Sequence, residues 1–159
     1  MAAPSKQRTG GAERRPDPRS RRVSALGEPH AFRDRPCRRC PWRTDCDLTD
    51  FTEEDMQRLR RADGRPGAEA RPGASTVGCH LDQPGTAHPF RLCAGWLATV
   101  GDHHVVVRMA LAVQAIPRRA VEPGPDWPAL HLNLDALLAA WIRQLAVRAG
   151  TPAPGRRTS

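Results

Sequence analysis

The positions of the five cysteines constrain the fold of this 159-residue chain more than any other sequence feature. Cys37 and Cys40 form a C-x-x-C pair, and Cys46 follows shortly after them. A C-x-x-C turn can direct two thiolates to one side of the chain, so one metal ion can take two ligands from four consecutive residues. Cys79 and Cys93 form a second group that can complete a tetrahedron. The spacing therefore predicts a metal site with the ligands Cys37, Cys40, Cys79 and Cys93.

Residues beside these motifs are further candidates for the site. His80 follows Cys79 directly and is either a substitute ligand or a neighbour that orients one. Cys46 is an additional candidate ligand because of its position after the C-x-x-C pair. Two residues that can shield a metal from water, and one that can offset thiolate charge, complete the predicted surroundings: Trp42, Trp96 and Arg43.

Two interpretations compete with a metal site. The five cysteines could form disulfides, but the odd number leaves one thiol over. The first residues also lack an apolar stretch of signal-peptide type, so we expect a cytoplasmic protein. Alternatively, the cysteines could be small buried apolar side chains, as free cysteines often are. Scattered core cysteines rarely fall into a C-x-x-C pair, which favours the metal interpretation.

The cysteine pattern does not determine which metal is bound. Four thiolates suit a closed structural zinc site, and they also suit a [4Fe-4S] cluster. We favour Zn²⁺ and keep the cluster as the alternative. A metal-dependent enzyme would need an open coordination position, and His80 and Asp82 would then be candidate water activators. No catalytic residue is predicted with four cysteine ligands, because they would close the coordination shell.

Composition divides the chain into a core with two flanking segments. Residues 1–34 are rich in Arg, Pro, Gly and Ser and predict a disordered basic arm, and residues 150–159 predict a disordered tail. Residues 35–149 remain as a cysteine-rich domain whose core a metal would help to stabilise. Residues 1–35 carry nine basic and four acidic side chains, so +5 of the formal +8 charge lies there. We therefore expect weak, non-specific nucleic-acid binding through the arm at most, and no membrane association.

The secondary structure is predicted to be mainly α, in a small irregular domain with long loops. Periodicity predicts helices over residues 50–61, 93–100, 103–116 and 132–147. The first has Asp50 or Thr52 as its cap, with Asp50 and Glu53 in a capping-box pattern, and it is expected to end near Gly64. The third ends at Pro117, and the last begins near Asn133 or Asp135. His103 and His104 are predicted to be cap or surface residues.

Three motifs in this order carry a resemblance. P-C-x-x-C-P-W-R, a helix, G-C-H, and then C-A-G-W before another helix resemble a small bacterial and phage family, the domain-of-unknown-function family numbered 6283. The resemblance covers about residues 36–115. It implies that the family-pattern cysteines are Cys37, Cys40, Cys79 and Cys93, and it carries no established activity. Cys46 lies outside that pattern.

A shorter resemblance would imply another function. C-x-x-C-P-x-R-x-x-C, which ends at Cys46, is similar to the central motif of WhiB-type regulators, which hold a [4Fe-4S] cluster and act on transcription. No cysteine precedes Cys37 here, whereas those proteins have one upstream. We therefore predict a zinc-binding structural or interaction module with an unidentified partner, which could be another protein. The alternatives are an iron–sulfur redox sensor that associates with DNA, and a metal-dependent enzyme.

Overall fold

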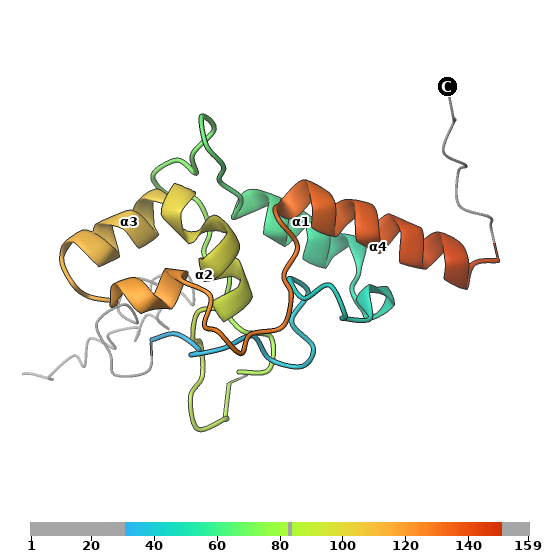
Figure 1. Ribbon diagram of the computed structural model, residues 1–159, viewed down its shortest axis with the longest axis horizontal. Helices are drawn as coiled ribbons and strands as arrows, with labels where there is room; N and C mark the ends of the chain where they lie inside the picture. Colours follow the sequence, from blue (N-terminus) through green and yellow to red (C-terminus); the bar gives the residue numbers. More distant parts are fainter. Residues whose placement is uncertain (1–30, 83, 151–159) are drawn as a thin grey trace, which may run out of the picture.

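The computed structural model describes residues 31–82 and 84–150. Within these residues the chain forms four α-helices joined by long irregular segments and short 3₁₀ turns, and its extended segments pair only through isolated bridges (Figure 1). This confirms the prediction of a mainly α domain with long loops. Apart from residues 31–34 and 150, the predicted basic arm and tail lie outside the described residues.

Helix α1, Glu53–Arg61, follows a 3₁₀ turn, η3, at Leu48–Asp50. Met56 and Leu59 are buried and face the core, as expected for residues three positions apart on one side of a helix. The helix ends at Arg61 with Ala62 as its C-cap, slightly before the predicted end near Gly64.

The capping box of α1 is not the predicted one. Thr52 is the N-cap and accepts a hydrogen bond from the Asp55 N–H, while the Asp55 carboxylate accepts the N–H of Thr52 at 2.9 Å. The prediction that Asp50 and Glu53 form the box is therefore wrong. Asp50 instead closes η3 and accepts a hydrogen bond from Arg39 at 3.0 Å, so it is not available to the helix.

Helix α2, Ala94–Val100, is continued by a 3₁₀ turn, η4, at Gly101–His103, in agreement with the predicted end of this helix. Trp96 and Leu97 are fully buried, which places α2 in the core. The Trp96 indole N–H donates to the carbonyl oxygen of Ala62 at 3.0 Å, so α2 is joined to the end of α1.

Helix α3, Val105–Ala112, is shorter than the predicted helix over residues 103–116. The reason is local, because Gln114 has φ of 57°, in the left-handed region that an α-helix excludes. Pro117 then precedes the 3₁₀ turn η5, Arg118–Val121. The predicted helix was too long because the apolar residues continue past Gln114, where the backbone leaves the helical conformation.

His104 is the N-cap of α3, which is one of the two positions predicted for it. Its side chain makes no capping hydrogen bond and is fully buried, so the alternative of a surface group is wrong. Its Nε2 lies 3.1 Å from the Ser75 carbonyl oxygen, and its ring packs edge-on against Trp96 with centroids 5.1 Å apart. His104 is therefore a core residue.

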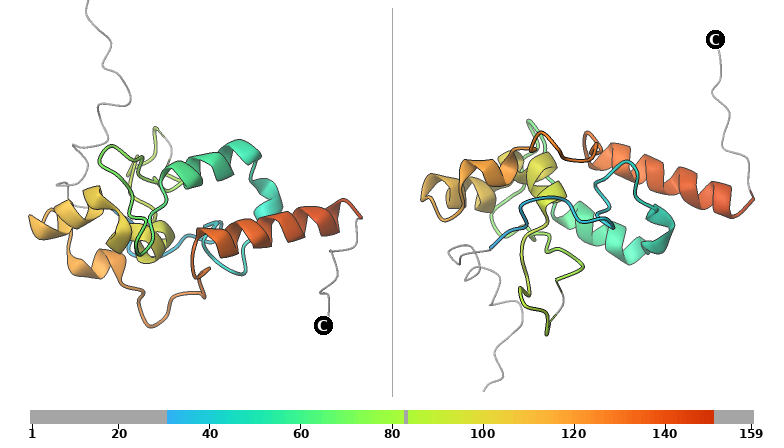
Figure 2. Two further views of the ribbon diagram at one scale, coloured as in Figure 1. Left: turned by 90° about the horizontal axis from the view of Figure 1, so that it is seen from above. Right: turned by 60° about the horizontal axis from the view of Figure 1, so that its bottom comes forward.

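Helix α4, Leu134–Arg148, begins as predicted at the N-cap Asn133, whose side chain accepts a hydrogen bond from the Ala136 N–H at 2.8 Å. Leu137 and Trp141 lie on its buried side. Helices α3 and α4 occupy opposite ends of the domain in all views (Figure 2). In the described part of the chain, no helix combines the length and apolar character needed to cross a membrane.

Side chains of α4 bind the backbone that follows the C-x-x-C pair. Gln144 accepts the Leu48 N–H at 2.7 Å through Oε1 and donates through Nε2 to the Cys46 carbonyl at 3.2 Å. The Trp141 indole donates to the Phe51 carbonyl at 3.1 Å. Helix α4 thus supplies hydrogen-bond partners to main-chain groups of an irregular segment, which has no regular secondary structure to pair them.

Three extended segments meet around Leu92. Its backbone forms a parallel bridge with Phe32 and an antiparallel bridge with Gly78. The Leu92 N–H donates to the Ala31 carbonyl at 2.9 Å. The packed part of the chain therefore includes residues just before the predicted boundary at 35.

Candidate metal centre

The C-x-x-C segment is shaped by consecutive turns. The Cys40 N–H donates to the Cys37 carbonyl at 3.0 Å, and the Arg43 N–H donates to the Cys40 carbonyl at 3.1 Å. This places both thiols on one short, hydrogen-bonded stretch. The chain leaving it pairs at Arg43 with Leu130 through an antiparallel bridge, which fixes the direction of the exit.

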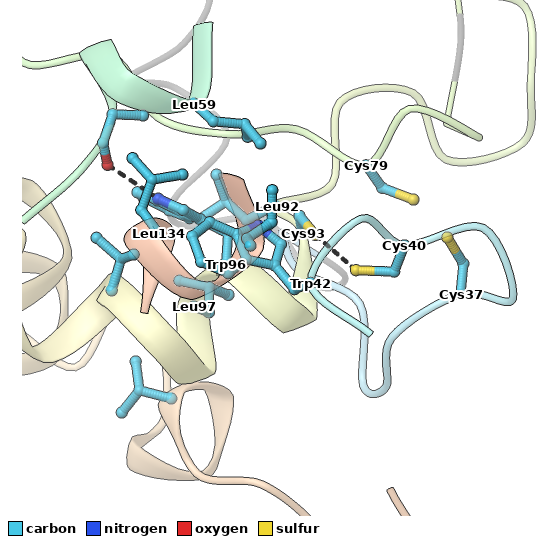
Figure 3. Close-up of a cluster of buried hydrophobic side chains, with 14 of the residues drawn as sticks. Cys37, Cys40, Trp42, Leu59, Cys79, Leu92, Cys93, Trp96, Leu97 and Leu134 are labelled. Atoms are coloured by element: carbon cyan, nitrogen blue, oxygen red, sulfur yellow. Dashed lines mark hydrogen bonds between the residues drawn. The ribbon is translucent and has the colours of Figure 1, made fainter. Parts of the chain in front are cut away.

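The four predicted ligands come together in two pairs. The sulfur of Cys40 lies 3.5 Å from that of Cys93, while the sulfurs of Cys37 and Cys79 lie within 4.8 Å of each other. In Figure 3 the Cys40–Cys93 pair lies beside Trp42, and Cys37 and Cys79 lie on the far side of Cys40. All four residues are buried, with at most 8% exposure. All five cysteines of the chain, Cys46 included, are free, so no disulfide framework is formed.

The start of α2 approaches the C-x-x-C segment at van der Waals distance. Cys93 is the N-cap of this helix and Gly95 lies in its first turn. A Cβ atom on Gly95 would stand 2.7 Å from both the Cys40 sulfur and Trp42 Cβ. Only a residue without a side chain fits there, so Gly95 permits the contact between the Cys40 and Cys93 sulfurs.

Within each pair, one thiol favours ionisation of the other. A hydrogen bond from Cys79 lowers the pKa of Cys37 to about 7 against the opposing effect of burial, while the same contact and burial raise the pKa of Cys79. A hydrogen bond from Cys40 likewise lowers the pKa of Cys93 despite complete burial. Contact with Cys93, together with burial, raises the pKa of Cys40.

His80 lies at the edge of the cluster. A ring nitrogen of His80 and the sulfurs of Cys37 and Cys79 all lie within 4.8 Å of one another. Burial, and then the charges of nearby arginines, lower the pKa of His80, so the imidazole is neutral at pH 7. A neutral imidazole is the form that binds metals. The structure thus brings His80 to the Cys37–Cys79 side of the cluster.

Asp82 has a different environment from the one expected of a water activator. Its buried carboxylate accepts hydrogen bonds from Arg91 at 2.9 and 2.8 Å and from Arg33 at 3.2 and 3.3 Å. Burial raises its pKa, but the hydrogen bonds from Arg91 and Arg33 outweigh that effect and hold the pKa below its ordinary value. A carboxylate with these partners is a poor base.

Cys46 and Arg43 are not part of the sulfur cluster. The Cys46 thiol is directed to the Asp47 carbonyl at 3.6 Å, and burial raises its pKa. Arg43 forms a two-pronged ion pair with Asp45, at 2.7 and 2.5 Å. The position of Cys46 gives no support to the WhiB-type arrangement, in which the third cysteine of this motif is a cluster ligand.

The two tryptophans beside the motifs differ in their roles. Trp42 is fully buried and, like Cys40, lies directly against Gly95 at the start of α2. Its indole N–H has no hydrogen-bond partner among the described residues. Trp96 is also fully buried, but its indole is hydrogen-bonded to Ala62, at the end of α1. Trp42 is thus placed to exclude water from the sulfurs, whereas Trp96 joins the helices.

Sequence reasoning missed the arginines that surround Asp82. Arg33 lies in the predicted basic arm and Arg91 lies outside every predicted helix, and neither has a local pattern that indicates a structural role. The available signal was their position, because Arg33 shortly precedes Cys37 and Arg91 shortly precedes Cys93. A charged residue next to a metal-ligand motif is a candidate neighbour of the metal.

Comparison with known proteins places the chain in a family. Residues 32–153 match the family of unknown function DUF6283, which is most of the chain. The protein therefore belongs to this family, as its cysteine motifs indicated. Neither the curated proteins nor the solved structures include a match to it.

Proposed function

We propose that Cys37, Cys40, Cys79 and Cys93 bind one zinc ion, and that the protein is a zinc-stabilised structural or interaction module. The observation that carries this proposal is the burial of four cysteine sulfurs in two adjacent pairs, contributed by three separate segments. Thiolate sulfur is the preferred ligand of structural zinc sites.

The distance between the sulfurs of Cys40 and Cys93 supports a single ion over a cluster. Tetrahedral zinc with Zn–S bonds of about 2.3 Å places its sulfurs about 3.8 Å apart. The Cys40 and Cys93 sulfurs are 3.5 Å apart, close to that value. In a [4Fe-4S] cluster each thiolate binds a different iron, so the ligand sulfurs lie farther apart than around one ion.

A structural role agrees with the position of the site in the fold. The cysteines belong to the same hydrophobic core as Trp42, Trp96 and Leu97, and the segments that carry them have few regular hydrogen bonds of their own. A metal joining these segments contributes its binding free energy to folding. Four thiolates also leave no open position for a substrate.

Metal analysis and an absorption spectrum of protein purified without oxygen test the proposal. We expect about one zinc per chain, no visible absorbance, and loss of both zinc and folded structure on treatment with a strong chelator. Iron with sulfide and a brown colour would instead establish the [4Fe-4S] alternative. Protein that folds without any metal would show that the cysteines are ordinary buried thiols.

Substitution of cobalt for zinc distinguishes the ligand sets. Tetrahedral Co²⁺ absorbs in the visible range, and its sulfur-to-metal charge-transfer band grows with each thiolate ligand. We expect the wild-type intensity in His80→Ala and a reduced intensity in Cys79→Ser. A loss of intensity or a spectral shift in His80→Ala would make His80 a ligand and leave one cysteine outside the metal shell.

A further inference from the structure

Each of the three segments that carry the cysteines also carries a charged residue of one ion cluster. Arg33 lies before Cys37, Asp82 lies after Cys79, and Arg91 lies before Cys93. The two guanidinium groups bind the same carboxylate, and each donates hydrogen bonds through two nitrogen atoms. We refer to Arg33, Asp82 and Arg91 as the arginine clamp.

Burial distinguishes the clamp from the surface ion pairs of the protein. The side chain of Asp82 is 4% exposed, and those of Arg33 and Arg91 are 26% and 21% exposed. The side chains of the pair formed by Arg118 and Asp102 are 60% and 44% exposed. A partly buried, bidentate pair is both stronger and more precise in geometry than an exposed one.

Backbone hydrogen bonds connect the clamp to the cysteines. The Cys79 N–H donates to the Arg91 carbonyl at 2.7 Å, and the Asp82 N–H donates to the Cys79 carbonyl at 3.0 Å. The Arg33 N–H donates to the carbonyl of Leu92, the residue before Cys93, at 3.0 Å. A change in the clamp is therefore transmitted to the position of Cys79 and Cys93 over one or two peptide units.

We propose that the arginine clamp is a positioning device for the metal centre, which holds the three cysteine-bearing segments together and slows release of the ion. This inference rests on the proposed zinc site. Zinc with four thiolates has a net charge of −2, and the clamp, with two guanidinium groups and one carboxylate, has a net charge of +1. Asp82 thus keeps two cations beside the site while the clamp as a whole still offsets its negative charge.

The clamp also accounts for a buried carboxylate that is not a ligand. Burying Asp82 without partners would be costly, and its four hydrogen bonds from arginine compensate for that cost. Asparagine at this position keeps the size of the side chain, but its NH₂ group would face guanidinium donors. Asp82→Asn therefore removes the charge and half of the acceptor capacity with little change in volume.

The rate of zinc release tests this proposal. Zinc-loaded protein is mixed with an excess of a chromogenic chelator, and wild type is compared with Asp82→Asn. We expect release to be about 10- to 100-fold faster in the variant, the range found when groups that orient metal ligands are removed. The cobalt spectrum of Asp82→Asn should equal that of wild type, because all four ligands remain. Asp102→Asn, which breaks the exposed bidentate pair with Arg118, is the matched control and should release zinc at the wild-type rate.

Amide hydrogen exchange of α4 separates positioning from general stabilisation. The hydrogen bonds of the clamp side chains involve no residue of α4, so exchange of this helix in the zinc form should be unchanged if the clamp acts locally. Equal acceleration of α4 exchange and of zinc release would overturn the proposal, as would release within twofold of wild type. If Asp82→Asn does not fold, Arg91→Lys, which keeps the charge and loses the two-pronged geometry, takes its place with the same expected result. A wild-type protein without zinc would refute the proposed function, and this inference with it.

Discussion

Gly95, in the first turn of α2, lies against Cys40 so closely that a Cβ atom would stand 2.7 Å from the Cys40 sulfur. The same Cβ would meet Trp42 Cβ at 2.7 Å, and that carbon cannot move without its backbone. The contact therefore sets how near α2 and the C-x-x-C segment can come. It makes a glycine in a helix a requirement of the cysteine cluster.

Gly95→Ala is expected to destabilise the protein although alanine is the better helix former. Alanine gains about 1 kcal/mol of helix propensity over glycine. Overpacking at a site that cannot relax costs about 1–3 kcal/mol, and separation of the cysteine pairs adds the loss of metal binding. We expect a lower free energy of unfolding in urea and weaker zinc binding.

Gly78→Ala is the control for that experiment. Its Cβ would meet no atom closer than the Arg91 carbonyl oxygen at 3.8 Å, an ordinary contact. It should retain zinc and wild-type stability to within about 0.5 kcal/mol. Unchanged zinc affinity in Gly95→Ala would show that the two segments can separate without cost.

Cys46→Ser should retain the metal, whereas Cys40→Ser should lose it. The Cys46 thiol is directed to the Asp47 carbonyl, and a serine hydroxyl can donate to the same oxygen. Cys40 instead contacts the Cys93 sulfur. Metal content after gel filtration measures the difference. Loss of metal from Cys46→Ser would contradict the assigned ligand set and favour the WhiB-type arrangement.

Gln144→Met is expected to cost about 1–3 kcal/mol, because the buried Leu48 N–H loses its acceptor. The Cys46 carbonyl loses its donor in the same variant. Thermal or urea unfolding measures the effect. Gln57→Met is the control, since Gln57 is exposed and its amide donates to the Glu53 side chain. It should change stability by less than about 0.5 kcal/mol. Equal effects of the two substitutions would mean that α4 does not support this segment.

The stability of the protein should fall as the pH drops below about 6.5, in part because of His104. Burial lowers the pKa of His104, and its hydrogen bond to Ser75 opposes this only partly. An unfolded histidine has a pKa of about 6.5, so between the lowered pKa and about 6.5 the unfolded state binds more protons than the folded state. Protonation therefore favours unfolding over that window, and the stabilisation from a neutral His104 is complete only above it.

The comparison of His104→Gln with wild type isolates this contribution. Glutamine can also donate to the Ser75 carbonyl but does not titrate. When the pH is lowered from about 7.5 to about 5, we expect the free energy of unfolding to decrease less in His104→Gln than in wild type. Acid release of metal affects both proteins and cancels in the difference. His103→Gln is the control, and a wild-type pH slope in both variants would contradict a role for His104.

The features that the sequence predicted are the local ones. A C-x-x-C pair is defined by four consecutive residues, and the Asn133 cap and the apolar side of α4 follow from residues within a few turns. The structure confirms the cap and brings the four predicted cysteines together. Their role as ligands stays a prediction.

The features that the sequence did not predict depend on distant partners. From the sequence, Asp50 and Thr52 are equally plausible caps of α1. The structure shows that Asp50 binds Arg39 instead. His104 is buried against Trp96 and hydrogen-bonded to Ser75, which is 29 residues away in sequence. The arginine clamp needs three separate segments to converge. In each case tertiary contacts decided between options that local propensity left open.

The hydrogen bonds between α4 and the segment after the C-x-x-C pair also bear on synthesis of the chain. Cys46 and Leu48 leave the ribosome 98 and 96 residues before Gln144, whose side chain binds their main-chain groups. At typical elongation rates of about 5–20 residues per second, this part of the nascent chain waits for many seconds without α4. Cys79 and Cys93 emerge within that interval, so all four predicted ligands can bind the proposed zinc before the last helix exists. A ribosome-bound chain that stops before α4 would show whether the metal centre can assemble ahead of the rest of the fold.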